Sequence, residues 1–254
     1  MLRRMSRGFA LLLAAVAVVA AGPAPAGTRL EGRLEWAQRV VLGFAVSGVI
    51  AEVLVRPGQR VAPGALLARL DTRPFDARVR ERAARVSALE PAFEEARREW
   101  KRAQELYERM VLSDRDRELV RIAYVKAESD LQAARAALER ARIEREYAEL
   151  RAPFDAMVLR VLGAPGQAQS AQLRVEPVIE LARAGAMAAV VIVPDGRVPP
   201  APGARAAVHA AGRVHAGRIV SVERIEGGWR VRVRFGFDGP GTLREGIPVT
   251  VELP

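Results

Sequence analysis

The sequence predicts an elongated α+β protein in which a split β-sandwich is interrupted by a long antiparallel α-helical coiled-coil hairpin and followed by a C-terminal antiparallel β-barrel. Three observations lead to this fold class. A Pro-Gly-Gln turn motif occurs twice, at residues 57–59 and 165–167, each time after a short strand-like pattern. A glycine-free segment with helical apolar spacing separates the two copies. Alternating apolar and charged residues with frequent glycines follow the second copy.

Residues 1–26 have the layout of an export signal. Three arginines within the first seven residues precede an apolar stretch at 9–21, and the small residues at 24–26 resemble a cleavage site. The apolar stretch is shorter than the ~20 residues that span a bilayer as a helix, so we expect cleavage, with a short retained N-terminal anchor as the alternative. Both alternatives place the rest of the chain outside the cytoplasm. The chain has no cysteine, which excludes disulfides and a lipid-bearing N-terminal cysteine.

Residues 27–42 read as a strand that associates with the C-terminal barrel, and residues 43–75 as one half of the sandwich. In this half, Pro57 and Gly58 fit the central positions of a type II turn, because proline fixes a negative φ and glycine accepts a positive one. The segment resembles half of the small lipoyl-like sandwich that carries biotin or lipoate on a lysine. It contains no lysine.

Residues 76–150 predict two antiparallel helices. The apolar side chains of each arm recur at alternating steps of three and four, which places them on one stripe of a helix, as in a coiled-coil seam. The first stripe consists of Val86, Leu89, Phe93, Ala96, Trp100, Ala103, Tyr107 and Met110, and the second of Val120, Tyr124, Ala127, Leu131, Ala134, Leu138 and Ala141.

Two residues mark the course of these helices. Ser113 fits the N-cap of the second helix, with Asp116 at its third position, so the tip of the hairpin is expected near Leu112 and Ser113. Pro91 lies inside the first arm, and because its ring clashes with the preceding turn we expect a kink or a short break at residues 89–91. An arm of this length must project from the rest of the molecule.

Residues 151–182 supply the second half of the sandwich. The stretch "FDAMVLRVLGAPGQAQ", from Phe154, aligns without gaps to "VSGVIAEVLVRPGQRV", from Val46. The alignment pairs the Pro57-Gly58 turn with Pro165 and Gly166. The helical hairpin is therefore predicted to be an insertion between two halves of one domain.

Residues 183–254 predict the barrel. The stretch "WRVRVRFGF" alternates strictly, so Trp229, Val231, Val233 and Phe235 should face inward and three arginines outward. Apolar-in and charged-out is the ordinary pattern of a half-buried antiparallel strand. An alternative is that the outward row contacts an acidic transporter surface or anionic lipid headgroups. This row consists of Arg230, Arg232 and Arg234.

The sequence contains no recognisable catalytic, cofactor-binding or metal site. His209 and His215 lie six residues apart without a neighbouring carboxylate or cysteine to complete a zinc set. Neither a phosphate-binding glycine loop with its lysine nor a G-x-S-x-G nucleophile elbow occurs. The net charge is +10, but arginines are interspersed with acids and do not alternate with stacking aromatics, so nucleic acid is not expected as a partner.

The order of these elements resembles the HlyD-type membrane fusion proteins, the periplasmic adaptor subunits of tripartite efflux and secretion systems in Gram-negative bacteria. The matching stretches are "SGVIAEVLVRPGQRVAPGALLARLD", "LQAARAALERARIEREYAELRAPFDAMV", and "GRIVSVE" through "LREGIPVTVEL". The resemblance implies a non-catalytic adaptor without a cofactor, located in the periplasm and associated with the inner membrane. It also implies three partners: an inner-membrane transporter of RND or ABC type, a TolC-type outer-membrane channel, and further copies of the chain in a hexameric ring.

The resemblance also implies a contact site at the hairpin tip. Family members carry an arginine, a leucine and a serine there that engage the channel, and Arg102, Leu106 and Ser113 fit their spacing. The alternative is that Arg102 is a solvated helix residue, Leu106 a packing residue and Ser113 only an N-cap. Many efflux adaptors continue past the barrel into a membrane-proximal domain, whereas this sequence stops at Pro254. Of the expected contacts, the resemblance therefore implies least about those with the transporter.

Two other function classes explain part of the sequence. A biotinyl or lipoyl carrier subunit needs a lysine in the turn that joins the two halves, but the helical segment replaces that turn, and Lys101 and Lys126 lie within the helices. A secreted coiled-coil scaffold explains the heptads but not the split repeat. Acylation of either lysine would favour the carrier.

Overall fold

A computed structural model describes residues 28–171, 175–237 and 243–254. The expected export signal at 1–26 lies outside the described residues. The described residues form two compact units: one comprises 28–34, 189–235 and 243–254, and the other comprises 35–171, 175–188 and 236–237. The predicted fold class is confirmed: a β-sandwich carries a helical hairpin in one unit, and a closed six-stranded barrel forms the other.

The sandwich consists of two four-stranded sheets, each built from both halves of the sequence repeat. One sheet has the strand order β2-β9-β7-β4 and the other β6-β5-β3-β8. The first half supplies β2 (Arg39–Leu42), β3 (Gly48–Val53), β4 (Arg60–Val61) and β5 (Leu66–Leu70). The second half supplies β6 (Glu149–Arg151), β7 (Ala156–Val161), β8 (Ala168–Gln169) and β9 (Ile179–Arg183). Each strand of one half has a counterpart in the other half, and replacing every strand by its counterpart turns the order of one sheet into that of the other. Neither half therefore forms a complete sheet of its own.

The repeated turns fasten each half to the other. The Gly58 N–H donates to the carbonyl of Val158, and the Gly166 N–H donates to that of Ile50, both at 2.8 Å. Gly58 has φ 83° and Gly166 φ 84°, as the predicted type II turns require. In both turns the glutamine side chain accepts a hydrogen bond from a backbone N–H three residues earlier, at 3.1 Å. The sequence repeat is therefore a repeat in three dimensions.

Replacing either turn glycine by alanine should cost nearly the same stability. An added Cβ at Gly58 or Gly166 meets no atom within 4 Å, so the cost comes from the positive φ alone. Gly58→Ala and Gly166→Ala are each expected to lower the free energy of unfolding by about 1 kcal/mol. Chemical denaturation of the two variants checks this, and a clear inequality between them would contradict the equivalence of the turns.

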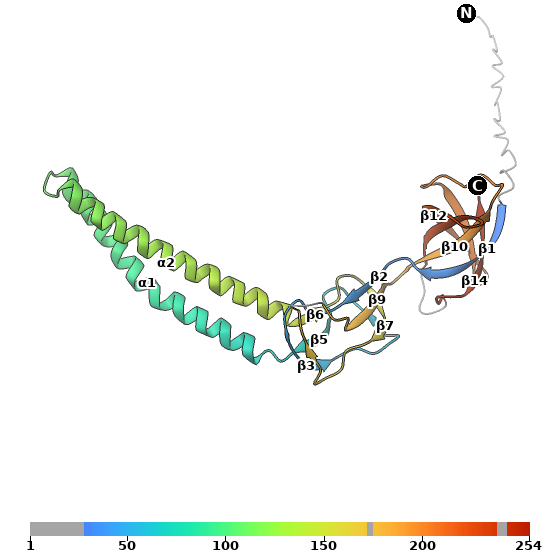
Figure 1. Ribbon diagram of the computed structural model, residues 1–254, viewed down its shortest axis with the longest axis horizontal. Helices are drawn as coiled ribbons and strands as arrows, with labels where there is room; N and C mark the ends of the chain where they lie inside the picture. Colours follow the sequence, from blue (N-terminus) through green and yellow to red (C-terminus); the bar gives the residue numbers. More distant parts are fainter. Residues whose placement is uncertain (1–27, 172–174, 238–242) are drawn as a thin grey trace, which may run out of the picture. The chain divides into compact units, whose positions relative to one another are not determined.

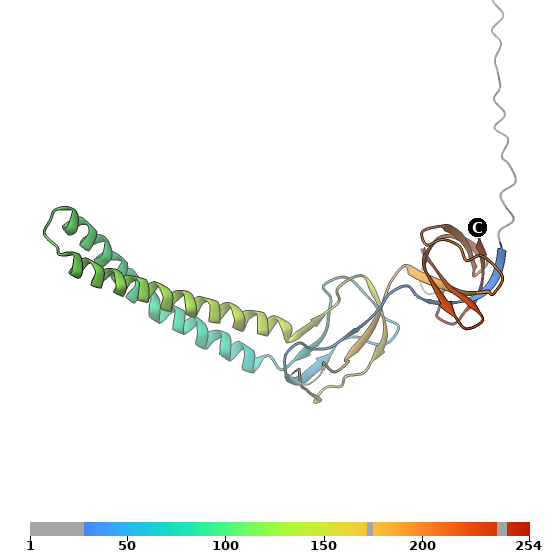
Figure 2. The same ribbon diagram turned by 45° about the horizontal axis from the view of Figure 1, so that its top comes forward.

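The two helices are α1 (Arg73–Glu108) and α2 (Asp114–Tyr147), and they lie side by side along their length (Figures 1 and 2). The break expected at residues 89–91 does not form, because α1 is continuous through Pro91. The proline is exposed to solvent. At the start of α1 the Thr72 side chain makes no capping bond, and Asp71 accepts from the Arg73 N–H at 3.1 Å instead. Hydrogen bonds from Arg73 lower the pKa of Asp71 to about 2.

The predicted seam holds the helices together, with one exception. Ala103, Leu131, Ala134, Leu138 and Ala141 are buried, and the other seam residues are half-buried except Met110. Met110 lies beyond the end of α1 with φ 58° and is 95% exposed, so its assignment to the seam was wrong. Three ion pairs also cross between the arms: Arg78–Glu144, Arg135–Glu90 and Arg145–Asp76. Exposed pairs of this kind contribute little, so apolar burial carries the packing.

The barrel has the strand order β1-β10-β13-β12-β11-β14, closed between β14 and β1. Its strands are β1 (Thr28–Trp36), β10 (Ala186–Pro194), β11 (Arg205–Ala210), β12 (Arg213–Ile225), β13 (Gly228–Gly236) and β14 (Pro248–Leu253). The prediction that residues 27–42 join the barrel is right only for β1. The following strand, β2, pairs with β9 and belongs to the sandwich. Within the described residues, no helix is both long enough and apolar enough to cross a bilayer.

Candidate functional site

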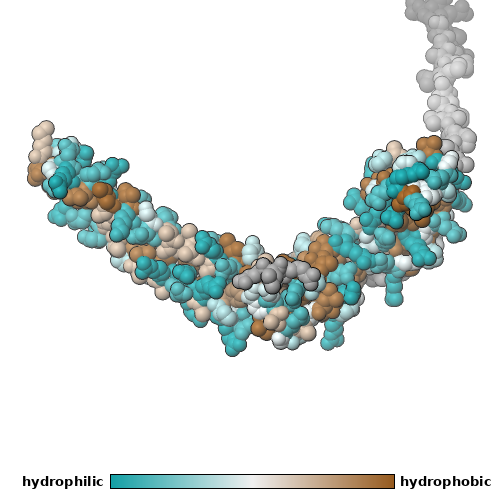
Figure 3. Space-filling view, in the orientation of Figure 1, coloured by the Kyte–Doolittle hydropathy of each residue, from teal (hydrophilic) through white to brown (hydrophobic). Residues whose placement is uncertain are grey.

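The tip of the hairpin exposes two apolar side chains. After α1 ends at Glu108, the chain turns through Met110 and Val111, which are 95% and 70% exposed. The turn is fixed by the Val111 N–H, which donates to the carbonyl of Leu106 at 2.9 Å. Figure 3 shows apolar side chains near this free end of the hairpin. Sequence reasoning missed Met110 and Val111 as surface residues because Met110 continues the seam spacing.

The three predicted tip residues lie at this end of the hairpin but have different surroundings. Arg102 is exposed, and its guanidinium lies 3.6 Å from the Glu99 carboxylate, a long i,i+3 pair that leaves it accessible. Leu106 is half-buried against the hairpin. Ser113 is the N-cap of α2, as predicted: its Oγ accepts from the Asp116 N–H at 3.1 Å and donates to the Asp116 carboxylate at 2.6 Å. Any partner that binds Ser113 must share it with this cap.

Aromatic contacts stiffen the last turns before the tip. The Arg117 guanidinium of α2 lies 3.9 Å from the ring centroid of Tyr107 of α1, within cation–π range. Further down, the rings of Phe93 and Tyr124 are 6.0 Å apart, and the Tyr124 hydroxyl donates to Glu128 at 3.1 Å. Desolvation, followed by the bond to Glu128, raises the pKa of Tyr124. The tip is therefore a small apolar surface on a braced helix pair.

Removing the Ser113 cap should loosen the tip without unfolding the hairpin. Ser113→Ala deprives the Asp116 N–H of its acceptor, and such N-cap losses cost about 1 kcal/mol. Amide hydrogen exchange of the first turn of α2 should accelerate accordingly. Ser129→Ala, at an exposed position in the middle of the same helix, is the matched control and should leave exchange there unchanged.

The face of α2 that points away from α1 carries a second stripe with helical spacing. Its members are all exposed, and only one of them is charged. We call this set the outer stripe: Ile122, Val125, Ser129, Ala133, Ala136, Arg140, Ile143 and Tyr147. A helix with apolar side chains on two faces has more packing surface than a single partner helix covers.

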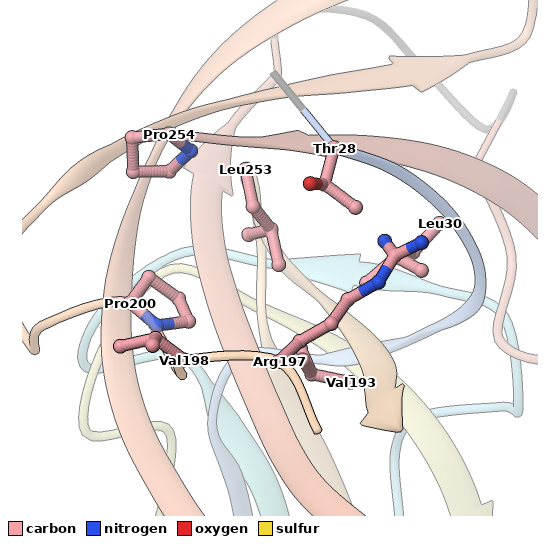
Figure 4. A pocket seen from close by; sticks show the side chains of 8 residues that line it. All are labelled: Thr28, Leu30, Val193, Arg197, Val198, Pro200, Leu253 and Pro254. Carbon is pink, nitrogen blue, oxygen red and sulfur yellow. The ribbon is translucent and has the colours of Figure 1, made fainter. Parts of the chain in front are cut away.

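An open pocket of about 320 Å³ lies on the surface of the barrel (Figure 4). The side chains that line it are apolar apart from those of Thr28 and Arg197. The apolar side chains are Leu30, Val193, Val198, Pro200, Leu253 and Pro254. This volume is at the small end of ligand sites.

The described residues contain no cluster of three or more potential metal ligands. The two histidines lie in adjacent strands but do not converge on one site. His209 Nε2 lies 3.5 Å from the Glu252 carboxylate, whereas the His215 ring packs 5.1 Å from that of Phe235. Lys101 and Lys126 lie exposed in the helices, away from the turns of the sandwich.

The alternation predicted for β13 is present. Val231, Val233 and Phe235 are buried in the barrel, and Trp229 is half-buried. The intervening residues Arg230, Arg232 and Arg234 lie on the outer face of the strand. Arg230 pairs with Glu223 of β12 at 3.9 Å.

Comparisons with known proteins agree with this architecture. No family model matches the sequence. The multidrug resistance protein MdtA of Photorhabdus laumondii subsp. laumondii is 24% identical over 127 residues, which cover 50% of this chain and 32% of MdtA. The chain therefore spans about a third of the length of this curated relative.

Two solved structures share most of the fold. A MacA-MexA chimera containing the Pseudomonas aeruginosa MexA α-hairpin domain superposes with a TM-score of 0.66 at 20% identity, covering 89% of this chain and 80% of the chimera. The membrane fusion protein Spr0693 of Streptococcus pneumoniae R6 has a TM-score of 0.66 at 13% identity, covering 89% of this chain and 98% of Spr0693. The chain has the fold of these membrane fusion proteins. It has the three parts that the sequence predicts, a sandwich, a helical hairpin and a barrel, so the stated resemblance holds for the fold.

Proposed function

We propose that this chain is a membrane fusion protein, a non-catalytic periplasmic adaptor that links an inner-membrane transporter to a TolC-type outer-membrane channel. It would serve efflux or secretion, with the energy supplied by the transporter. The hairpin tip carries the proposal. Met110 and Val111 expose apolar side chains at the far end of the arm, and apolar surface of this kind favours a protein partner.

The outer stripe supports self-association of the hairpins. Across the hairpin, α1 residues at the level of Ala133 and Ala136 are also small and exposed on their outer face. The Arg135–Glu90 pair fixes this level, and the small residues near it are Ala84, Ser87, Ala88 and Pro91. Small residues on both outer faces let neighbouring helices approach closely. Copies of the chain would therefore pack side by side, and we propose a hexameric ring.

Site-specific cross-linking in cells tests the docking of the tip. Because the natural sequence has no cysteine, each introduced thiol is unique. Leu106→Cys, Val111→Cys and Ser113→Cys should each cross-link to an outer-membrane channel protein. Ser129→Cys, which is exposed on the shaft, should not. If the tip variants are folded and abundant but capture no channel protein, the proposed docking is wrong.

A charge placed in the outer stripe tests the ring. Ala133→Glu combined with Ala136→Glu should lower the self-association constant at least about tenfold in sedimentation equilibrium, because two carboxylates would be buried between helices. Gln132→Glu combined with Glu139→Gln changes neighbouring exposed positions outside the stripe and should leave association intact. Equal association of all these proteins would exclude the outer stripe as the contact between copies.

A further inference from the structure

Three arginines lie directly opposite one another on adjacent strands of the barrel. Arg205 of β11 pairs in register with Arg218 of β12, and Arg218 pairs with Arg234 of β13. Directly opposite residues of antiparallel strands point to the same side, and all three side chains are exposed. We call Arg205, Arg218 and Arg234 the arginine row. Neighbouring strands lie ~4.8 Å apart, so three positive charges fall within about 10 Å.

The repulsion between these three positive charges destabilises the barrel unless an anion neutralises them. Like charges directly opposite on neighbouring strands are destabilising. Elsewhere in the barrel arginines meet carboxylates: Arg224 lies 2.8 Å from Asp195, for example. Within the described residues the arginine row forms no ion pair. Its one hydrogen bond to the protein runs from Arg218 to the carbonyl of Gly203, at 3.2 Å. The row therefore offers its guanidinium groups to an anion outside the chain.

A β-bulge adds an apolar side chain beside the row. The pairing of β12 with β13 shifts between Ile219 and Ser221, which leaves Val220 without a partner on β13. Val220 follows Arg218 by two residues and is 43% exposed. Bulges of this kind are features that re-aim a side chain. Exposed arginines with an apolar side chain among them are the composition of surfaces that bind at a lipid interface.

The charge of the whole barrel unit has the same sign. Its described residues contain eleven arginines, six carboxylates and no lysine, so the net charge is 11 − 6 = +5. The export signal predicted at 1–26 directs the chain across the inner membrane whether it is cleaved or retained. An anionic bilayer surface is thus the anion source that this part of the chain meets first.

We propose that the arginine row binds the phosphate groups of anionic phospholipids at the outer surface of the inner membrane, with Val220 contacting the interface. Guanidinium groups match phosphate oxygens through paired N–H donors. Anionic headgroups cover the whole surface of such a bilayer, so their positions do not have to match the spacing of the three arginines. This inference is independent of tip docking, because the row and the hairpin lie in different units.

Vesicle co-sedimentation with the full chain tests the proposal. The wild type should bind phosphatidylcholine vesicles containing phosphatidylglycerol, and should bind pure phosphatidylcholine far more weakly. The triple variant Arg205→Gln, Arg218→Gln, Arg234→Gln should lose about tenfold or more of this affinity, since each basic residue near an anionic surface contributes severalfold. The control Arg29→Gln, Arg33→Gln, Arg213→Gln removes the same charge from exposed barrel positions outside the row and should lose much less.

Thermal unfolding of the same proteins separates binding from damage to the fold. Removing the row relieves repulsion, so its variant should melt at the wild-type temperature or above while binding vesicles less. Equal losses of affinity in both triple variants would mean that net charge alone attracts the barrel, and would overturn the proposal. Undiminished vesicle binding by the row variant would also overturn it; loss of cross-linking to an inner-membrane protein in that variant would then identify an acidic protein as the partner.

Discussion

Leu131→Ala is expected to lower the free energy of unfolding of the hairpin by about 3 kcal/mol, within the 2–5 kcal/mol typical of such cavities. Leu131 is 1% exposed and is the largest fully buried side chain of the seam. The long arms have little else to compensate, because most of the seam is only half-buried and the ion pairs that cross it are exposed.

Circular dichroism at 222 nm during denaturation measures this loss, since most of the helical signal comes from α1 and α2. Ile122→Ala is the matched control. It removes an aliphatic side chain of the same size from the same helix, but that side chain is 56% exposed on the outer stripe. The control should change stability by well under 1 kcal/mol for the isolated chain. If Ile122→Ala lowered the free energy of unfolding as much as Leu131→Ala, then the outer stripe of α2 would be as buried as its seam, contrary to this structure.

Gly32→Ala should have a comparable effect on the barrel. A Cβ on Gly32 of β1 would lie 2.4 Å from the carbonyl oxygen of Val190 and 2.5 Å from a methyl group of Val191, both on β10. The first of these atoms is backbone and is held by the closed sheet, so β1 and β10 must separate. Forced overpacking of this kind costs about 1–3 kcal/mol, and separation of β1 would add lost pairing.

Calorimetry of the barrel transition tests this prediction, with Gly236→Ala as the control. Gly236 does not have a positive φ, and the nearest atom to an added Cβ there is the Gly185 carbonyl oxygen at 3.7 Å. The control should therefore fall within about 0.5 kcal/mol of wild type. If Gly32→Ala melts like this control, the close approach of β1 to β10 is not present in solution.

The fold class could be predicted because its signals are local. A Pro-Gly pair specifies its own turn, a heptad specifies its own seam, and strict alternation specifies one strand. The gapless repeat also predicted matching strands in the two halves of the sandwich. In the structure, β3 and β7 begin and end at aligned residues, and so do β4 and β8. Ser113 was likewise recognisable as a cap from its own neighbourhood.

The sequence did not reveal features that depend on distant partners. Whether β2 joins the barrel or the sandwich is decided by pairing with β9, more than a hundred residues later. Met110 fits the seam by spacing, and only the early end of α1 turns it outward. The arginine row requires the registers of three strands, whereas the sequence indicated only the arginines along β13. Pro91 shows the reverse case: its local signal predicted a kink or a short break, but α1 runs through it without a break.

The point at which the hairpin leaves the sandwich has a consequence for the length of the protein. Both helices attach at the adjacent strands β5 and β6, where the Leu70 N–H donates to the Ala148 carbonyl at 2.9 Å. Inserting or deleting one heptad in each arm would change the arm by about 10 Å and keep the seam in phase, while every strand stayed in place. The distance that the hairpin reaches from the sandwich can thus be adjusted by paired insertions, while the sandwich itself stays unchanged.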